Sequence, residues 1–559
     1  MQLKLIPFVI LLFASMSDVF GQDKNVIELL GAKSLQFDKS MGIDAQRLIG
    51  EVRFRHKGAL MFCDSAYLYN ASNSIDAFGN VRVLQGDTLE LLSDKLFYSG
   101  NTQIVKVRNN VLLNDKEMTL ATNTLDFNRK TGVAVFYDEG LITSKVNENR
   151  LISCEGIYNS NTEFFYFRED VELTNPKYVV ETDTLDYDNL NEISYFQGPT
   201  FIYSDENTIY CENGWYDTKK DISQFNKNAY LDNGQQVLRG DSLWYWRTGG
   251  LGRAYENVSI TDTTEQYIIR GAFGSYFEKT GKSLVTGRAE FIQYDDLDSL
   301  FLHGDTLLAV NDTATGNKIY AYPNVRFYRT DMQGVADSLV YVRADSMIHM
   351  FENPVLWSDH LQITGDTIQL KTTDTGIERL YVFDHAFMAD RVYEDDSLKY
   401  NQIKGKKLTG YFQNNELKRV FINGNGQSLY YAMEEAKVEV PDTAGTNVIE
   451  KDSVVLSDMS PDTLTSDTVP ADSLQKTITI TEQKIIGVNK AICSNIAIYL
   501  ENKKVQKIRF LVKPDGAFIP LFKFTTEDAF FDGFYWHSER RPKDRYDIFR
   551  VETPVVLLQ

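Results

Sequence analysis

The chain has 559 residues, and its 31 Tyr and 34 Phe against only 12 Pro favour strands over disorder. Its net charge of −20 argues against a nucleic-acid partner, because phosphates bind to basic surfaces. The length could hold several average domains, although a repeat protein of this size can be one body.

The N-terminus has the layout of a cleavable secretory signal over residues 1–21. Lys4 precedes an apolar run from Leu5 to Ala14, and small residues follow up to Gly21. This run is shorter than the roughly 20 residues that a membrane-spanning helix needs, and no later stretch reaches that length. No Cys follows the signal, which argues against a lipid anchor. We therefore expect an exported, soluble protein without a transmembrane segment.

Residues 22–432 repeat one short phrase, seen as TDTLDYD at 182–188, GDSLWYW at 240–246 and ADSLVYV at 336–342. A small residue precedes an acid, an apolar residue follows two positions after the acid, and an aromatic residue often follows four positions after it. The acid position recurs every 28–33 residues, and after 40 residues at the last step. The twelve matching positions are Asp64, Asp94, Asn123, Glu155, Asp183, Glu212, Asp241, Ala272, Asp305, Asp337, Asp366 and Lys406.

A second strand pattern lies between the copies of this phrase, as in GEVRF at 50–54, GNVRV at 79–83 and PNVRF at 323–327. A turn residue introduces alternating apolar and polar residues, which is the pattern of a half-buried strand. Each unit of ~30 residues therefore predicts two strands with one apolar face each, and about twelve such units form a β-repeat array.

The four cysteines follow the same pattern. Cys63, Cys154 and Cys211 stand in the small position before the acid, and Cys493 begins the similar phrase CSNIAIYL. Cys154 and Cys211 are two units apart, which is beyond easy disulfide reach if neighbouring strands lie about 4.8 Å apart. We interpret the cysteines as small packing residues and expect neither a disulfide nor a metal site.

The repeat stops at residue 432. Residues 433–484 form an acidic, Ser/Thr-rich insertion that is expected to be disordered, and strand character returns over 485–520 as the closing strands of the array. Residues 521–559 are an aromatic tail with a basic cluster. This tail either docks a partner or folds back as a cap on the last strands.

No catalytic pattern stands out. The six His are scattered, and the HExxH, GxSxG, P-loop and GxGxxG patterns do not occur. The recurring acid can be interpreted as a turn residue that accepts local backbone N–H groups, as a calcium ladder or as a catalytic carboxylate. The turn role is favoured, so we expect no enzyme activity and no cofactor.

Two such sheets facing each other can enclose an apolar trough with a continuous inner face. Removing an acyl chain from water stabilises the bound state by about 0.8 kcal/mol per CH₂ group. Near-equivalent repeats would offer this gain evenly along the trough, so that a lipid could pass along it.

The phrases GNVRVLQGDTLELLSDKLFYSGNTQIVKVRNNVLL at 79–113 and EDVELTNPKYVVETDTLDYDNLNEISYFQG at 169–198 resemble the OstA-like family of lipopolysaccharide transport. This family includes the periplasmic bridge protein and the N-terminal domain of its outer-membrane partner. The likeness covers residues 28–432 and 485–520. No further run of strands follows residue 520, so we do not expect the outer-membrane translocon itself.

The resemblance implies an all-β fold, namely an elongated, open, taco-like β-jellyroll. It also implies a groove for lipid A acyl chains and head-to-tail stacking with other jellyroll proteins of the bridge through end strands. Carried over by position, the groove-lining candidates are Leu96, Tyr98, Leu125, Phe127, Leu185, Tyr187, Leu243 and Tyr245. These side chains could equally fill a closed core.

We therefore expect a periplasmic protein, associated with the outer membrane, that holds the acyl chains of lipopolysaccharide or a related glycolipid during transport. The alternative is a non-enzymatic β-solenoid for adhesion or glycan binding at the cell surface.

Overall fold

The computed structural model describes residues 26–37, 45–86, 89–146, 148–205, 207–294, 298–310, 316–373, 376–393, 396, 398–414, 416–441, 477–501 and 504–551. The predicted signal, residues 1–21, lies outside them. The chain divides into two compact units. Unit 1 takes its residues from Met1–Thr330, Asp337–Asp345 and Pro542–Gln559, and unit 2 from Asp331–Ala336 and Ser346–Arg541.

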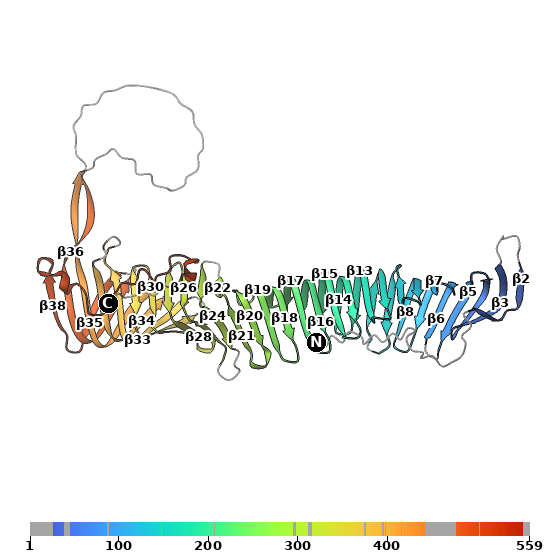
Figure 1. Cartoon of the computed structure of the whole chain (residues 1–559). Helices are drawn as coiled ribbons and strands as arrows, with labels where there is room; N and C mark the ends of the chain where they lie inside the picture. Colours follow the sequence, from blue (N-terminus) through green and yellow to red (C-terminus); the bar gives the residue numbers. More distant parts are fainter. Residues whose placement is uncertain are drawn as a thin grey trace, which may run out of the picture. The chain divides into compact units, whose positions relative to one another are not determined.

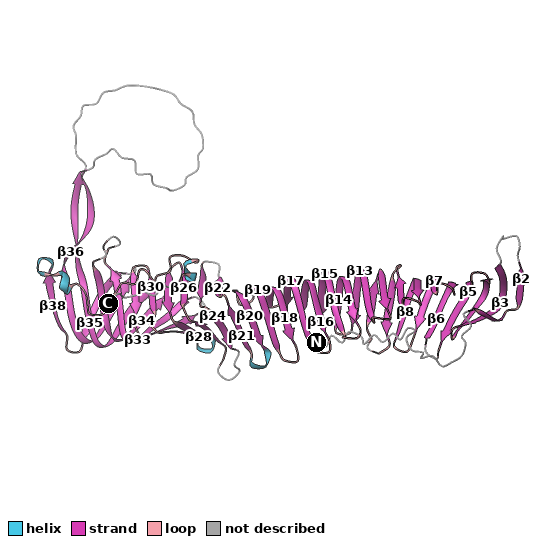
Figure 2. Cartoon of the chain, in the orientation of Figure 1, coloured by secondary structure: helices cyan, strands magenta, loops and turns pink. Residues whose placement is uncertain are grey.

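Unit 1 consists of antiparallel strands, and Figures 1 and 2 show its long strands following one another along the sheet. Each long strand pairs with the next from β3 to β8 and from β13 to β20. Between them the short strands form two separate paths, β8–β9–β12–β13 and β8–β10–β11–β13. Its strands are β1 (Glu28–Gly31), β2 (Ser34–Phe37), β3 (Ala45–His56), β4 (Ala59–Tyr69), β5 (Ser74–Gln85), β6 (Leu89–Ser99), β7 (Ile104–Asn114), β8 (Met118–Asn128), β9 (Val133–Phe136), β10 (Gly140–Ser144), β11 (Arg150–Ser153), β12 (Glu155–Asn159), β13 (Phe164–Asn175), β14 (Tyr178–Asp188), β15 (Ile193–Ser204), β16 (Thr208–Asp217), β17 (Ile222–Asp232), β18 (Gln236–Trp246), β19 (Leu251–Asp262), β20 (Tyr267–Phe277), β21 (Lys282–Thr286), β22 (Glu290–Tyr294), β23 (Ser299–His303), β24 (Thr306–Val310), β25 (Lys318–Tyr322), β26 (Val325–Arg329) and β28 (Ser338–Val342). Short 3₁₀ turns are η2 (Glu278–Thr280), η3 (Arg343–Asp345) and η6 (Asp547–Phe549).

Unit 2 contains β27 (Met332–Ala336), β29 (Met347–Phe351), β30 (Val355–Ser358), β31 (Leu361–Thr364), β32 (Thr367–Thr373), β33 (Gly376–Arg391), β34 (Tyr400–Gln413), β35 (Glu416–Pro441), β36 (Thr477–Glu501), β37 (Lys504–Leu511) and β38 (Asp515–Pro520), followed by the 3₁₀ turns η4 (Leu521–Lys523) and η5 (Thr526–Asp528). The all-β prediction is confirmed by these elements in both units. The number of repeats stays a prediction.

Each long strand of unit 1 bends at a β-bulge near its middle. In β5 the register shifts between Phe78 and Val81, where Gly79 and Asn80 have φ of 76° and 46°. Gly and Asn tolerate this left-handed conformation best, and a bulge turns the strand. The bulge divides β3 into Val52–His56, which we call arm A, and Ala45–Ile49, which we call arm B. The halves of later strands that continue the pairing of each part from strand to strand belong to the same arm. The two arms face each other across the apolar interior.

A ladder of side-chain pairs follows the bulges and explains the repeated acid. The side-chain amide of Asn80 donates to Asp64 at 2.7 Å, and the amide of Asn110 donates to Asp94 at 2.8 Å. The same pairing joins Asn228 to Glu212, Asn257 to Asp241 and Asn324 to Asp305. The sequence suggested local backbone N–H groups as partners, whereas these five acids accept from the amide at the bend of the next strand. The phrase that contains the acid and the phrase that begins with the turn residue therefore lie on neighbouring strands, and the acid and the turn residue meet where these two strands bend.

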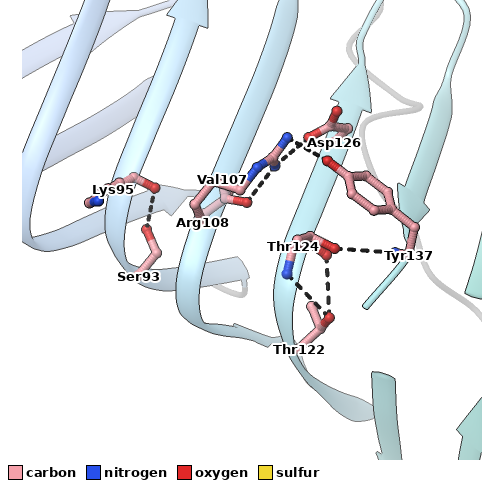
Figure 3. Close-up of polar contacts among 8 residues, drawn as sticks. All are labelled: Ser93, Lys95, Val107, Arg108, Thr122, Thr124, Asp126 and Tyr137. Atoms are coloured by element: carbon pink, nitrogen blue, oxygen red, sulfur yellow. Dashed lines mark hydrogen bonds and ion pairs between the residues drawn. The ribbon is translucent and has the colours of Figure 1, made fainter. Parts of the chain in front are cut away.

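The position before the acid must be small because its side chain points into the closed end of the bend. Ser93 and Thr122 each donate from their hydroxyl group to the carbonyl oxygen two residues further on, at 3.3 Å (Figure 3). All four cysteines are free, as expected, and Cys63 and Cys211 are buried. Burial raises the pKa of Cys63 to about 11 and that of Cys211 to about 12, which keeps both thiols protonated near neutral pH.

The outward side of arm B is polar. Arg108 pairs with Asp126, and its guanidinium also donates to the Tyr137 hydroxyl at 2.6 Å (Figure 3). Arg168 makes the matching pair with Asp186 two repeats later. Such partly exposed pairs contribute little stability, so the interior carries most of the folding energy.

Unit 2 differs because the C-terminal tail covers the outward side of its arm A. Gln402 is fully buried, donates to the Ala529 carbonyl at 2.8 Å and accepts from the Phe531 N–H at 2.9 Å. Gln362 binds the backbone of Tyr535 and His537 in the same way, at 2.8 Å each. The tail thus folds back on the strands, which is one of the two interpretations that the sequence left open.

Gln333, another outward residue of unit 2, also binds the tail. Arg541 donates to the side-chain oxygen of buried Gln333 at 2.6 and 2.8 Å. Gln333 lies opposite Trp357, which lies opposite Gln362. Gln333, Trp357 and Gln362 thus lie next to one another on three neighbouring strands. Of these, Gln362 bonds to the backbone of the tail and Gln333 bonds to the Arg541 side chain. Within unit 1, the end of the tail packs by Phe549 against His303, with ring centroids 4.9 Å apart.

The predicted insertion has different boundaries in the structure. Strand β35 continues to Pro441 and β36 begins at Thr477, and these two residues are paired. The expected range 433–484 was therefore too wide, because KVEV and TITI alternate apolar and polar residues as strands do. The remainder, residues 442–476, lies outside the described residues.

We predict that Gly271→Ala destabilises unit 1 by about 1–3 kcal/mol, the range for overpacking. A Cβ atom there would meet the Val285 side chain and lie 2.7 Å from the Thr286 carbonyl oxygen. The control is Gly252→Ala on the neighbouring strand, where the nearest atoms are 3.6 and 3.7 Å away. Urea unfolding followed by circular dichroism measures both. Equal midpoints for the two variants would contradict the tight bend.

We predict that Gln402→Leu loosens the tail, because the Ala529 carbonyl and the Phe531 N–H would lose their partners at a cost of about 1–3 kcal/mol. Hydrogen exchange should speed up in residues 526–541. Gln413→Leu, at an exposed position of the same strand, is the matched control and should leave this exchange unchanged. Unchanged protection in Gln402→Leu would show that ring contacts alone hold the tail.

Candidate apolar binding cavity

An apolar cavity lies between the arms at the N-terminal end of unit 1. Its volume is about 150 Å³, and the unoccupied space reaches about 1260 Å³ when the part open to solvent is included. Apolar surface that lines such a space favours an apolar ligand, because binding removes that surface from water. Arm A contributes Phe54, Met61, Val83, Leu91, Leu113 and Leu120, and arm B contributes Ile75, Leu96, Val107, Leu125, Phe127 and Phe136.

Strand alternation decides which residues reach the cavity. Leu113 lines it at 7% exposure, whereas the preceding Leu112 points outward and is 36% exposed. In β6, Leu89 and Leu91 line the cavity and are only half-buried. These half-buried leucines face the open space, so a bound chain would remove their surface from water.

Polar groups gather at the rim. The Tyr98 hydroxyl of arm B lies 2.9 Å from His56 Nδ1 of arm A, so this hydrogen bond joins the two arms. Gln85 and Arg129 also line the cavity. Burial raises the pKa of Tyr98, and the charge and hydrogen bond of nearby Arg129 oppose this rise. The rim is therefore polar and cationic, above an apolar interior.

Aromatic side chains close the other end of the cavity. Tyr158 stacks on Phe165 with ring centroids 4.3 Å apart, and Phe165 lies 6.5 Å from the ring of Tyr187. Tyr178 and Tyr216, further along unit 1, are 2% and 6% exposed. The cavity thus extends from β3 to β13, and the aromatic side chains further along, such as Tyr178 and Tyr216, are buried. The unbroken channel expected from the repeat stays a prediction.

The eight predicted lining residues separate into two groups. Leu96, Tyr98, Leu125 and Phe127 line the cavity. Leu185, Tyr187 and Leu243 lie further along unit 1 and are buried, at 1%, 3% and 7% exposure. Tyr245 is half-buried, and its hydroxyl donates to Glu278 at 3.0 Å. Lipid binding by any of them stays a prediction.

The sequence interpretation missed the arm A side of the cavity. Phe54, Val83 and Leu113 belong to the second pattern, GEVRF, GNVRV and NNVLL, which was interpreted as amphipathic strand without being assigned to the groove. The alternation in that pattern was the available signal. The sequence carries no signal for where the cavity ends, because Leu185 and Tyr187 beyond it are of the same residue types as Leu96 and Tyr98 around it.

Among the described residues, no group of three or more His, Cys, Asp or Glu side chains is placed to hold a metal ion. Within the same part of the chain, no helix has the length and apolar character needed to cross a membrane.

Comparison with known proteins gives one family match. The model of the OstA-like protein family matches residues 24–183 and 177–241, which include every residue lining the cavity. Among curated proteins, no match to the chain was found. One similar solved structure is LptH, the LptA-homologous periplasmic component of the conserved lipopolysaccharide transport device from Pseudomonas aeruginosa. It shares 11% identity over 26% of this chain and 82% of LptH, and its TM-score of 0.15 is too low to carry an argument.

We predict that Leu91→Trp lowers the affinity for a small fluorescent naphthylamine probe at least about tenfold, because the larger side chain occupies cavity volume at a cost of over 1.4 kcal/mol. Leu92→Trp, on the outward side of the same strand, is the control and should bind the probe as the parent protein does. Fluorescence titration measures both affinities. Equal weakening by both variants would place the probe elsewhere.

Proposed function

Because the chain is OstA-like over residues 24–241, we propose that it is a lipid-binding component of lipopolysaccharide transport. In this proposal the protein holds acyl chains of lipopolysaccharide or a related glycolipid in the cavity between the two arms. The observation that carries the proposal is an apolar, open cavity inside the region that matches the family.

The energetics support this use of the cavity. Each CH₂ group that leaves water for an apolar site contributes about 0.8 kcal/mol. Leu89, Leu91 and Val105 are half-buried in the structure and would gain contacts with a bound chain. The blind end at Tyr158 and Phe165 limits how deep a chain can reach. The part of the protein that binds lipid is therefore the N-terminal part of unit 1.

The role is proposed to be non-catalytic and periplasmic. Binding and release of an acyl chain need a shaped apolar surface and no reacting group. The N-terminal pattern of residues 1–21 is typical of an export signal, and the transport of lipopolysaccharide crosses the periplasm. Association with the outer membrane follows from the same role.

Partners are proposed to join at the ends of the strand array. Strands β1 and β2 each pair with β3, and β37 and β38 each pair with β36. No other strand of the described residues pairs with their outer edges, and an unpaired edge can accept another strand. Phe37 and Phe518 are 54% and 51% exposed near these edges. Other jellyroll proteins of a transport bridge could add a strand there.

Photocrosslinking in cells tests the proposed lipid. Tyr98→p-benzoylphenylalanine places the crosslinker in the cavity lining, and Phe97→p-benzoylphenylalanine places it on the outward side of the same strand. We expect lipopolysaccharide to be captured at position 98 and not at position 97. The two substitutions replace similar aromatic rings, so expression should be comparable.

Absence of lipid at both positions would contradict the proposal. Retention of the purified protein on delipidated polysaccharide, together with that absence, would favour the alternative of a glycan-binding surface protein.

A further inference from the structure

The rim of the cavity brings a permanent positive charge next to an apolar space. Arg129 lies one residue beyond the end of β8, and both Arg129 and Phe127, two residues earlier, line the cavity. The Arg129 backbone N–H donates to the Gln103 carbonyl at 3.0 Å, which fixes the chain at this point. An arginine side chain stays protonated at any physiological pH.

Donors and acceptors from both arms surround this charge. The Tyr98 hydroxyl lies 2.9 Å from His56 Nδ1, and Tyr98 and Arg129 interact electrostatically. Gln85 adds a side-chain amide to the same lining. His56 and Gln85 come from arm A, whereas Tyr98 and Arg129 come from arm B. The group thus spans the mouth of the cavity.

A guanidinium group has donors in a planar fork that matches phosphate and carboxylate oxygens. Hydroxyl and imidazole groups can add further hydrogen bonds to the same anion. The rest of the lining is aliphatic and aromatic and can contact only an alkyl chain. The chemistry of the lining therefore fits a molecule with an anionic end and an apolar chain.

We propose that Arg129, His56, Tyr98 and Gln85 form a binding site for the phosphate or carboxylate group of an amphiphile whose alkyl chain lies in the cavity. This inference rests on the proposed function, which requires only that the cavity holds acyl chains. It adds that the cavity orients its ligand and discriminates by head group. A protein of net charge −20 would otherwise repel an anionic lipid, so one local cation at the mouth sets where the head group can rest.

Calorimetric titration with three ligands of one chain length tests this site: dodecyl phosphate, dodecanoate and dodecanol. We expect the parent protein to bind dodecyl phosphate or dodecanoate at least about tenfold more tightly than dodecanol. The anion that binds with the higher affinity shows whether the site prefers a phosphate or a carboxylate. The preference should shrink as salt rises, because the mouth is open to solvent.

Arg129→Gln should reduce the ratio of anion to alcohol affinity to about 1–2, and Arg129→Lys should restore part of it. The matched control is Arg47→Gln, at an exposed outward position of β3, which should keep the parent ratio. Thermal unfolding midpoints confirm that each variant is folded.

The outcomes separate this inference from the proposed function. A parent protein that binds all three ligands equally would overturn the head-group site and leave acyl-chain binding standing. Retention of the preference in Arg129→Gln would also overturn it. A parent protein that binds none of the three ligands would contradict both the head-group site and the proposed acyl-chain binding.

Discussion

The fold of unit 1 depends on the bend in the middle of each long strand. A straight meander of these lengths would be a flat sheet with one apolar face exposed, whereas a bulge in each long strand folds the sheet over so that two apolar faces meet. The bend needs left-handed backbone, which Gly79 and Asn80 supply in β5, and it needs an inner position without bulk, which Gly271 supplies in β20. The Asn–acid pairs fasten neighbouring bends to each other. The most repeated residues of the chain are therefore those that make the bend, and the apolar space between the arms is a consequence of it.

The sequence predicted much of this arrangement. Alternation in phrases such as GNVRV and GDTLELL predicted which side of each strand is buried, and it placed Leu96 and Leu125 on the inner side, where the structure has them. The constant distance of 16 residues between Asp64 and Asn80, and again between Asp94 and Asn110, could have shown the pairing. It was overlooked because each residue type has a sufficient local explanation as a turn former.

The extent of the open cavity could not be predicted in this way. Alternation reports the direction of a side chain, but the space between two arms depends on the combined size of residues that are distant in sequence. Tyr158 stacks on Phe165, and Phe165 makes a tilted contact with Tyr187, whereas the smaller Val105 and Ala134 line the cavity on the same arm. Leu96 and Leu185 occupy equivalent positions in the pattern, and only Leu96 lines the cavity. A column in an alignment of repeats is thus insufficient to separate a lining residue from a core residue.

The repeats differ from one another both in the residues that face the interior and in those that face outward. These differences give separate parts of the array separate binding properties. In a stacked array each repeat contacts mainly its neighbours, so interior and exterior can change locally without loss of the fold. Glu90 on the outward side of β6 forms a surface ion pair with Arg82, whereas Gln362 and Gln402, which hold the same repeat position in unit 2, are buried beneath the tail. An even trough would bind a chain equally at each point and would give it no preferred position. The open cavity, its aromatic end and its cationic rim differ from the rest of the described interior, so in the proposed function they give a bound chain one position and one orientation.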